Sequence, residues 1–275
     1  MTTGEIMTLL SARGFRFTHS LGQNFLVDDR ALETIVRGAD VENKNVLEIG
    51  AGAGCLTSVL CQYAKRVLTV EIDEKLIPVL ETVLAPYKNV KLVEGDALQL
   101  DLKALTEEYF EGEPFCVVAN LPYYITTPIL ETLLGSRLPL LSMTVMLQKE
   151  AAQRVQAQPG NKEYSPLAVH LRYRCKAEKL LVATPDCFSP QPHVESVVLK
   201  FTMREDVPPV PEEGFVKLVK SCFLMRRKTL LNNLLGYGLN RETAGKVIAD
   251  CGFPPSVRAE ALSLEDFIHL YQSIH

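Results

Sequence analysis

Short apolar runs rich in β-branched residues alternate with longer amphipathic stretches along most of the chain. Such runs between helical segments are typical of a parallel sheet whose strands are joined by crossover helices. Residues 73–84 illustrate the helical pattern, with an acidic first turn and an apolar stripe at Leu76, Val79, Leu80 and Val83. The predicted strands are residues 46–49, 66–70, 90–93, 115–119, 141–147, 177–182 and 194–201. We therefore predict an α/β fold.

The pattern changes in the last part of the chain. Residues 204–214 contain prolines among acidic residues, which is typical of a linker. Beyond this segment the apolar spacing is helical throughout, as at Phe215 and Val219. The predicted domains are residues 1–205 and 212–275.

Composition is that of a soluble globular protein. Of the 275 residues 47% are hydrophobic and 23% are charged. The seven cysteines form no Cys-x-x-Cys pair, which argues against a disulfide framework or a zinc site and favours a reducing cytosol. The amino terminus has no basic-then-apolar signal pattern, and the uncharged stretch at residues 138–148 is shorter than the ~20 apolar residues that cross a bilayer. We expect a cytoplasmic protein.

Basic residues cluster in the helical region, although the net charge is −4. No acidic residue occurs from Gly214 to Arg241, and a clustered basic face matters more for phosphate contact than net charge does. The basic residues there are Lys217, Lys220, Arg226, Arg227, Lys228 and Arg241. A weaker enrichment contains Arg172, Arg174, Lys176 and Lys179. For either cluster taken alone, a solvated helix face is the favoured interpretation.

Three of the predicted strands end in side chains suited to an adenosine ligand. The first predicted strand runs into the glycine turn Gly50-Ala51-Gly52-Ala53-Gly54, whose main chain a ligand can approach closely. Its spacing is Gly-x-Gly-x-Gly, which differs from the Gly-x-Gly-x-x-Gly spacing that binds the pyrophosphate of a dinucleotide. Glu71 ends the second predicted strand, where an acid typically accepts both ribose hydroxyls. Asp96 follows the third and could accept from an adenine amine. Each acid alone could instead have a surface or capping role.

The tetrapeptide Asn120-Leu121-Pro122-Tyr123 follows the fourth predicted strand. The carboxyl edge of an open α/β sheet is where ligands bind. The tetrapeptide combines three features that suit the binding of a flat base by its exocyclic amine. They are the amide oxygen of Asn120, the turn fixed by Pro122 and the aromatic ring of Tyr123. The alternative is an ordinary strand-ending turn.

These motifs resemble the class I S-adenosylmethionine-dependent methyltransferases, and the tetrapeptide narrows the resemblance to those that methylate an amino nitrogen. Four further segments resemble the ribosomal RNA adenine dimethyltransferases, most closely the bacterial small-subunit branch, which dimethylates two adjacent adenosines near the rRNA 3′ end. The four segments are residues 19–26, 146–150, 188–194 with Ser196, and 226–234. The match runs from about residue 15 to the C-terminus. It implies a Rossmann-like class I methyltransferase sheet with a small C-terminal all-α domain, and a lead-in of residues 1–40 that covers the cofactor.

The resemblance also implies a role for individual residues. The implied S-adenosylmethionine contacts are Asn24, Leu26, Gly50, Gly52, Glu71, Asp96, Ala97 and Asn120. The implied target-base residues are Asn120, Leu121, Pro122, Tyr123 and Phe188. Two departures from the family pattern are Ala51, where many relatives have proline, and the segment around His193, where lysine is commoner. We expect Ala51 to change the rigidity of the loop rather than abolish binding.

The implied chemistry needs no metal, because the cofactor's sulfonium already makes its methyl group electrophilic. Asn120 is neutral, so we expect it to accept a hydrogen bond from the adenine amine and position it, with Tyr123 and Phe188 stacked on the base. Core packing is the alternative for Phe188. The base must be unstacked to enter, which favours a loop or single strand. The predicted RNA contacts are Arg226, Arg227 and Lys228. We expect a monomer that acts on small-subunit rRNA within a partly assembled 30S subunit and contributes to its biogenesis.

Other functions remain open at this stage. The nearest is the large-subunit rRNA adenine methylase that confers macrolide resistance, although residues 146–150 and 226–234 favour the small-subunit branch. The glycine spacing disfavours an NAD-dependent oxidoreductase. Intact Glu71 and Asn120 disfavour a non-catalytic ribosome-assembly factor. Protein or DNA amine methylases more often have a second proline where this chain has Leu121.

Overall fold

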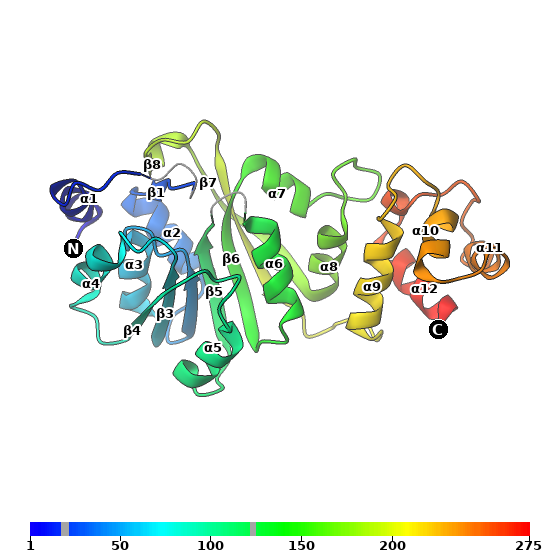
Figure 1. Cartoon of the computed structure of the whole chain (residues 1–275), viewed down its shortest axis with the longest axis horizontal. Helices are drawn as coiled ribbons and strands as arrows, with labels where there is room; N and C mark the ends of the chain where they lie inside the picture. The colour runs from blue at the N-terminus through cyan, green and yellow to red at the C-terminus, as the bar shows by residue number, and fades with distance from the viewer. Residues whose placement is uncertain (18–21, 122–124) are drawn as a thin grey trace. The chain divides into compact units, whose positions relative to one another are not determined.

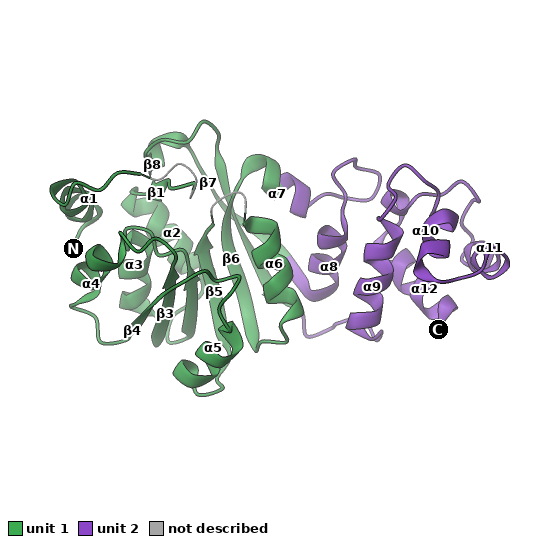
Figure 2. Ribbon diagram, viewed as in Figure 1, with its two compact units in different colours: residues 1–152, 177–203 green, residues 153–176, 204–275 purple. Residues whose placement is uncertain are grey.

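The structure is a computed structural model that describes residues 1–17, 22–121 and 125–275 (Figure 1). The chain divides into two compact units, and each unit is built from two segments (Figure 2). Unit 1 consists of Met1–Ala152 and Ala177–Met203. Unit 2 consists of Gln153–Lys176 and Arg204–His275.

A seven-stranded sheet lies mainly in unit 1, in the order β4-β3-β2-β5-β6-β9-β7. The strands from β4 to β6 are parallel to their neighbours, and β9 is antiparallel to β6. The strands are β2 Asn45–Ile49, β3 Arg66–Glu71, β4 Val90–Glu94, β5 Phe115–Asn120, β6 Leu140–Gln148, β7 Cys175–Ala183 and β9 Ser196–Met203. All seven predicted strands are therefore confirmed, each to within two residues at either end.

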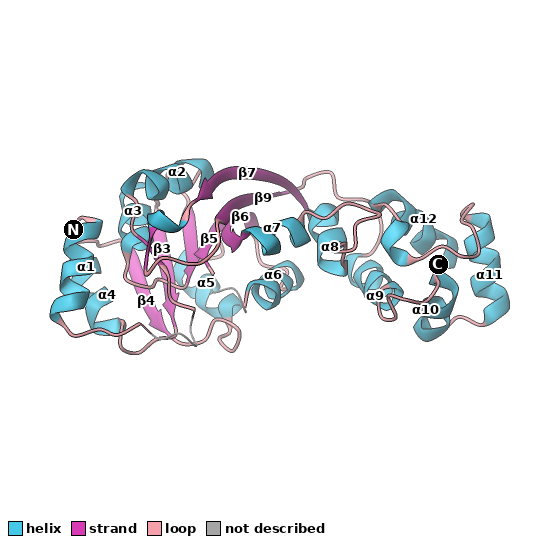
Figure 3. Ribbon diagram, turned by 90° about the horizontal axis from the view of Figure 1, so that it is seen from above, coloured by secondary structure: helices cyan, strands magenta, loops and turns pink. Residues whose placement is uncertain are grey.

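Helices cover both faces of this sheet (Figure 3). Val46 and Val67 pack into a core with apolar side chains of α1 to α4. Leu47 and Leu68 are also fully buried but point to the opposite face, because side chains alternate along a strand. Helices α5 and α6 lie on that opposite face. The helices are α1 Thr3–Ala12, α2 Asp29–Ala39, α3 Cys55–Tyr63, α4 Ile77–Leu84, α5 Leu102–Phe110, α6 Thr126–Gly135 and α7 Lys149–Val155.

Helix α4 begins later than the sequence pattern predicts. The predicted start, Asp73, is wrong, since the helix begins at Ile77. The Asp73 N–H donates to the Glu71 carboxylate at 2.9 Å, and the Asp73 carboxylate accepts from the Lys75 N–H at 3.1 Å. Asp73 therefore forms a turn. Pro78 lies in the first turn of α4, where its missing N–H would have no helical partner in any case.

A second sheet pairs only two short strands, β1 Phe25–Leu26 and β8 Phe188–Ser189. They are antiparallel, with Leu26 opposite Phe188. The N–H of Val27 extends the pairing by donating to the Cys187 carbonyl at 2.8 Å. This sheet was not predicted, because strands of two residues are too short to show a hydrophobic period in the sequence.

Unit 2 is helical and has its own hydrophobic core. Tyr164 and Tyr173 belong to this core, and the Tyr173 ring stacks on Phe215 with centroids 4.8 Å apart. Residues 153–176, which the sequence analysis placed in the first domain, thus belong to unit 2 because their aromatic side chains complete its core. Of the predicted linker, residues 204–214, the first eight residues contain no helix or strand, whereas the last three form the start of α9. The helices are α8 Pro166–Arg174, α9 Glu212–Cys222, α10 Leu230–Tyr237, α11 Arg241–Asp250 and α12 Leu264–Ile274.

Candidate active site

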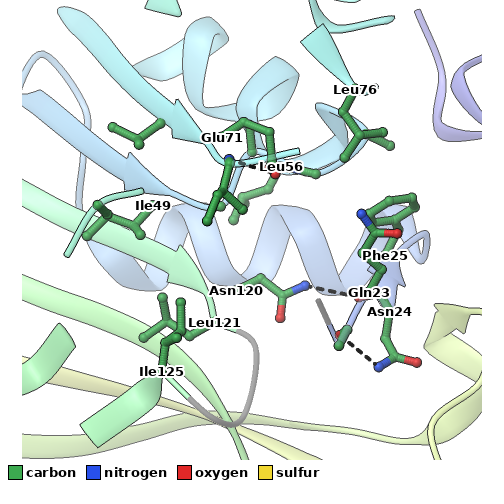
Figure 4. A pocket seen from close by; sticks show the side chains of 18 of the residues that line it. Gln23, Asn24, Phe25, Ile49, Leu56, Glu71, Leu76, Asn120, Leu121 and Ile125 are labelled. Carbon is green, nitrogen blue, oxygen red and sulfur yellow. Dashed lines mark hydrogen bonds between the residues drawn. The ribbon is translucent and has the colours of Figure 1, made fainter. Parts of the chain in front are cut away.

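A cavity of about 360 Å³ lies in unit 1 beside the carboxyl ends of β2, β3, β4 and β5 (Figure 4). The strand order reverses between β2 and β5, which is where an open α/β sheet leaves a crevice for a ligand. The two strand ends are close, because a Cβ added at Gly50 would lie 3.6 Å from the Asn120 main-chain oxygen. All the predicted cofactor residues line the cavity: Asn24, Leu26, Gly50, Gly52, Glu71, Asp96, Ala97 and Asn120.

The loop between β2 and α3 needs its glycines for two reasons. Gly50, Gly52 and Gly54 have φ angles of 81°, 56° and 85°, a region that L side chains rarely adopt. A Cβ at Gly52 would also lie 3.0 Å from the ring of Phe25, which lines the cavity. Ala51 has a negative φ, so its methyl group imposes no backbone strain. The loop therefore presents bare main chain to the cavity.

Glu71 is buried at the end of β3 and is held by three backbone N–H groups. Its Oε2 accepts from Gly52 at 2.7 Å, and its Oε1 accepts from Ile72 at 3.0 Å and Asp73 at 2.9 Å. Burial raises the pKa of this carboxyl, while the three N–H groups act in the opposite direction. A carboxylate has about four acceptor positions. Glu71 therefore has room for one ribose hydroxyl, and accepting both would displace a backbone N–H.

Asp96 lies just after β4 with one oxygen committed to the fold. Its Oδ1 accepts from the N–H of Leu98 at 2.9 Å. No donor in the described parts of the chain occupies Oδ2. Gly95, with φ of 153°, fixes this turn by donating its N–H to the Glu71 carbonyl at 2.8 Å. Asp96 is thus positioned beside the cavity with one acceptor oxygen to spare.

Asn120 ends β5 with its side chain oriented by the lead-in segment (Figure 4). Its Nδ2 donates to the Asn24 carbonyl at 3.3 Å. Because the amide nitrogen is used in this way, Oδ1 points elsewhere, and no donor among the described residues reaches it. The site therefore holds an amide whose oxygen is available as an acceptor.

Two other predicted target-base residues also line the cavity. Leu121 is 2% exposed, and Phe188, on β8, is 4% exposed. Phe188 packs in the hydrophobic core and also lines the cavity, and its stacking on a target base stays a prediction. Pro122 and Tyr123 lie outside the residues that the structure describes.

Glu48, two residues before Gly50, lies inside the fold and does not line the cavity. Its Oε2 accepts from the Thr69 hydroxyl at 2.6 Å, whereas Oε1 has no hydrogen-bond partner within the described chain. Burial raises the pKa of Glu48 to about 7, and the neighbouring Glu71 acts in the same direction. The hydroxyls of Thr57 and Thr69 oppose this shift.

The predicted RNA-binding residues follow α9 in unit 2 and do not all have the same surroundings. Arg226, Arg227 and Lys228 are all exposed. The Arg226 guanidinium, however, donates to the main-chain carbonyls of Lys162 and Tyr164. Arg227 and Lys228 make no ion pair or side-chain hydrogen bond with any described residue.

Three residues of the second basic enrichment, Arg172, Arg174 and Lys176, have partners within unit 2, whereas Lys179 lies in unit 1. Arg174 donates to the Glu212 carboxylate at 2.9 Å, and Lys176 lies 3.7 Å from a carboxylate oxygen of Asp206. Arg172 donates to the main chain of residue 156 at 2.8 Å. These cations serve the fold of unit 2.

The described residues were compared with the requirements of a metal site and of a membrane span. Over residues 1–17, 22–121 and 125–275, no group of three or more His, Cys, Asp or Glu side chains could hold a metal ion. None of the described helices combines the length and apolar content needed to cross a bilayer.

Comparison with known proteins decides the family. The family described as ribosomal RNA adenine dimethylase matches residues 14–275. The chain belongs to this family. A relative from Geobacillus sp. (strain WCH70), ribosomal RNA small subunit methyltransferase A, is 40% identical over 282 residues, which cover 99% of this chain and 97% of that protein.

Two solved structures share the fold. A dimethyladenosine transferase from Plasmodium falciparum has a TM-score of 0.74 at 26% identity, covering 88% of this chain and 94% of that one. The 23S rRNA methyltransferase ErmE has a TM-score of 0.70 at 24% identity, covering 91% of this chain and 99% of that one. The predicted fold class is confirmed. As a member of the ribosomal RNA adenine dimethylase family, the chain is an S-adenosylmethionine-dependent methyltransferase.

Two side chains that were not predicted as site residues, Gln23 and Ile72, also line the cavity. Gln23 donates to the Asp73 carboxylate at 2.7 Å, and Asp73 in turn binds Glu71, so the lead-in segment is tied to that buried acid. Ile72 lines the cavity and is 48% exposed, which makes it an apolar surface for a flat ring. Gln23 lies in the family-like segment 19–26 and Ile72 is next to Glu71, so adjacency to predicted contacts was the available signal.

Proposed function

We propose that this enzyme transfers methyl groups from S-adenosylmethionine to the N6 amino groups of two adjacent adenosines near the 3′ end of small-subunit (16S) rRNA. The name of the Geobacillus relative supports the choice of ribosomal subunit. The observation that carries the proposal is the orientation of Asn120, whose nitrogen is engaged by Asn24 and whose oxygen remains available at the cavity. An exocyclic amine is a hydrogen-bond donor, so it matches this acceptor.

The cofactor residues fit an adenosine that carries a methionine chain. Glu71 has one acceptor position for a ribose hydroxyl, and Asp96 Oδ2 can accept from the adenine amine. Main chain at Gly50 and Gly52 allows close approach, and Leu26 contributes apolar wall from the lead-in strand. When bound, S-adenosylmethionine supplies a methyl group made electrophilic by the sulfonium.

The protein's task is to prepare the acceptor amine. The lone pair of the N6 nitrogen is delocalised into the adenine ring, which makes it a poor nucleophile. Hydrogen bonds from its two N–H groups to Asn120 Oδ1 and to the carbonyl of Leu121 or Pro122 favour a tetrahedral nitrogen and localise the lone pair. Orientation of this kind can supply about 7–11 kcal/mol. Asn120 is neutral and acts by positioning, and the proton released by the methylated nitrogen passes to water.

The second methyl transfer places a larger demand on stacking. A monomethylated amine retains only one N–H, so one of the two acceptor contacts is lost. Tyr123 and Phe188 then carry more of the positioning, with each stack worth about 1–3 kcal/mol. We expect Phe188→Ala to slow the second transfer more than the first, measured as the ratio of dimethylated to monomethylated adenosine over time. Equal slowing of both transfers would contradict this role.

We assign RNA holding to the helical domain of residues 212–275 within unit 2, where Arg227 and Lys228 are exposed cations that pair with no described residue. The target base enters unpaired, since extraction from a duplex costs unstacking energy. We further propose a cytoplasmic monomer whose substrate is a partly assembled small subunit, so that methylation contributes to subunit biogenesis.

The experiment is transfer of labelled methyl from S-adenosylmethionine to small ribosomal subunits that lack their 3′-end adenosine methylation. Large subunits and naked rRNA are assayed in parallel. Two methyl groups on each of two adjacent adenosines, only in the small-subunit sample, are expected. Labelling of large subunits would refute the choice of substrate, and binding of the cofactor without transfer to any sample would refute the proposed acceptor.

A further inference from the structure

The family-like segment of residues 146–150 lies at the carboxyl end of β6, and none of its residues lines the cavity. In the strand order β4-β3-β2-β5-β6, the cofactor residues Asp96, Glu71 and Gly50 follow or end β4, β3 and β2. Asn120 ends β5, at the boundary of that group. Because the cofactor occupies the strand ends on one side of Asn120, the RNA that flanks the target base must approach from the side of β6.

Gln148, the last residue of β6, lies on the same face of the sheet as Asn120. Met146 is the register partner of Asn120 on the neighbouring parallel strand. Side chains alternate along a strand, so Gln148, two residues further on, returns to the face of Met146 and Asn120. A strand rises about 3.3 Å per residue, which places Gln148 about 7 Å beyond the level of Asn120. Gln148 therefore lies one step outside the position of the target amine.

The side chain of Gln148 is not committed to the fold. It is partly exposed and makes no hydrogen bond with any described residue. Its neighbours, in contrast, bind one another. The Lys149 Nζ donates to Glu195 Oε2 at 2.7 Å, and the Lys149 N–H donates to the Glu195 carbonyl at 3.0 Å. Ser196, opposite Gln148 on β9, is 1% exposed. Gln148 therefore offers both an amide oxygen and an amide nitrogen to a ligand.

We infer that Gln148 binds the adenosine next to the one being methylated and recognises that this neighbour is unmodified. The inference rests on the proposed function, in which two adjacent adenosines are the substrates, and it adds a specificity-determining residue. A glutamine amide makes two hydrogen bonds with adenine, since Oε1 accepts from the N6–H and Nε2 donates to N7. An N6,N6-dimethylated adenine has no N6–H, so it leaves Oε1 without a donor.

This contact distinguishes the two halves of the reaction. While the first adenosine is methylated, its neighbour is unmodified and binds Gln148 through both hydrogen bonds. While the second adenosine is methylated, its neighbour already carries two methyl groups and no longer offers the donor. Gln148 therefore accelerates methylation of the first adenosine and contributes nothing to methylation of the second.

The test is a time course of methyl transfer by the full-length protein to unmethylated small ribosomal subunits. Mass spectrometry of the rRNA 3′ fragment counts the methyl groups on each adenosine, which gives one rate for the adenosine completed first and one for the other. Gln148→Ala should lower the first rate about tenfold and leave the second rate unchanged. The cofactor Kd, measured by calorimetry, should stay as in the wild type. Gln272→Ala, which removes an exposed amide from α12, is the matched control and should leave both rates unchanged.

Gln148→Met separates hydrogen bonding from packing, because it keeps the length of the side chain and removes both hydrogen-bonding groups. It should lower the first rate as Gln148→Ala does. Wild-type rates in Gln148→Met would overturn the inference, and so would equal slowing of both adenosines in Gln148→Ala, which indicates a general structural role.

The wild-type time course keeps this inference apart from the proposed function. Dimethylation of both adenosines by the wild type, together with either contrary result in the variants, means that the role of Gln148 is wrong while the proposed function stands. Absence of transfer by the wild type refutes the proposed function and the role of Gln148 with it.

Discussion

Glu48 should make the stability of unit 1 fall as pH rises, the reverse of what an ion-paired carboxylate does. Its pKa is about 7 in the fold against an ordinary value of 4.5, so between these values the folded protein keeps a proton that the unfolded chain has released. The free energy of unfolding contributed by this group is therefore highest below pH 4.5, declines up to about pH 7 and is constant above. The difference in pKa corresponds to about 3 kcal/mol.

The perturbation is Glu48→Gln, which keeps the shape and the acceptor for the Thr69 hydroxyl but cannot ionise. Wild type and variant should be equally stable near pH 4.5, and the variant should be more stable by about 3 kcal/mol at pH 8. Urea unfolding followed by circular dichroism at pH 5, 6, 7 and 8 measures this difference directly. Glu42→Gln is the control, since it removes the same charge from an exposed position and should follow the wild type. A stability difference between Glu48→Gln and wild type that does not change with pH would refute the reasoning.

Three further substitutions probe the cavity. Asn120→Ala should lower kcat about a hundredfold and change the cofactor Kd much less, because the substitution removes the group that positions the amine. Single-turnover transfer measures the rate and calorimetry measures the Kd; a wild-type rate would contradict the mechanism. Gly52→Ala should weaken cofactor binding about tenfold, since residue 52 has φ of 56° and an added Cβ would lie 3.0 Å from the Phe25 ring. Gly4→Ala is the control in the same titration, because a Cβ added at Gly4 would meet no atom within 4 Å. Val27→Pro removes the N–H that donates to Cys187 and should weaken cofactor binding, because the paired strands β1 and β8 supply Leu26 and Phe188 to the cavity wall. Val27→Ala keeps the N–H and should bind the cofactor more tightly than Val27→Pro; equal affinity in the two variants, measured by calorimetry, would contradict this.

The sequence predicted those features that depend on short stretches of chain. Each strand of the seven-stranded sheet could be predicted because a run of β-branched apolar residues is its own signal, as at residues 115–119. The residues at the strand ends could then be brought together, because parallel strands present their carboxyl ends at one edge; Glu71 and Asp96 line one cavity for that reason.

What the sequence could not supply is the direction in which a side chain points and the pairing of distant short segments. The charge of Arg226 is visible in the sequence, but its hydrogen bonds to the main chain of residues 162 and 164 are not. The pairing of Leu26 with Phe188 joins residues far apart in the chain through strands too short to carry a pattern. The start of α4 was misplaced because Asp73 is equally suited to begin a helix and to close a turn on Glu71.

The division of unit 2 into two chain segments constrains how the protein can be made. During synthesis, Tyr164 and Tyr173 leave the ribosome well before Phe215, the ring against which Tyr173 stacks. Between the two segments the chain must first deliver β7 and β9 to the sheet. The nascent chain therefore exposes an unfinished aromatic surface until α9 emerges, and a fragment cut at the linker would keep that surface permanently. Removal of only residues 212–275 thus does not release an intact catalytic domain, because a minor part of the second core, including Tyr164 and Tyr173, stays attached to unit 1.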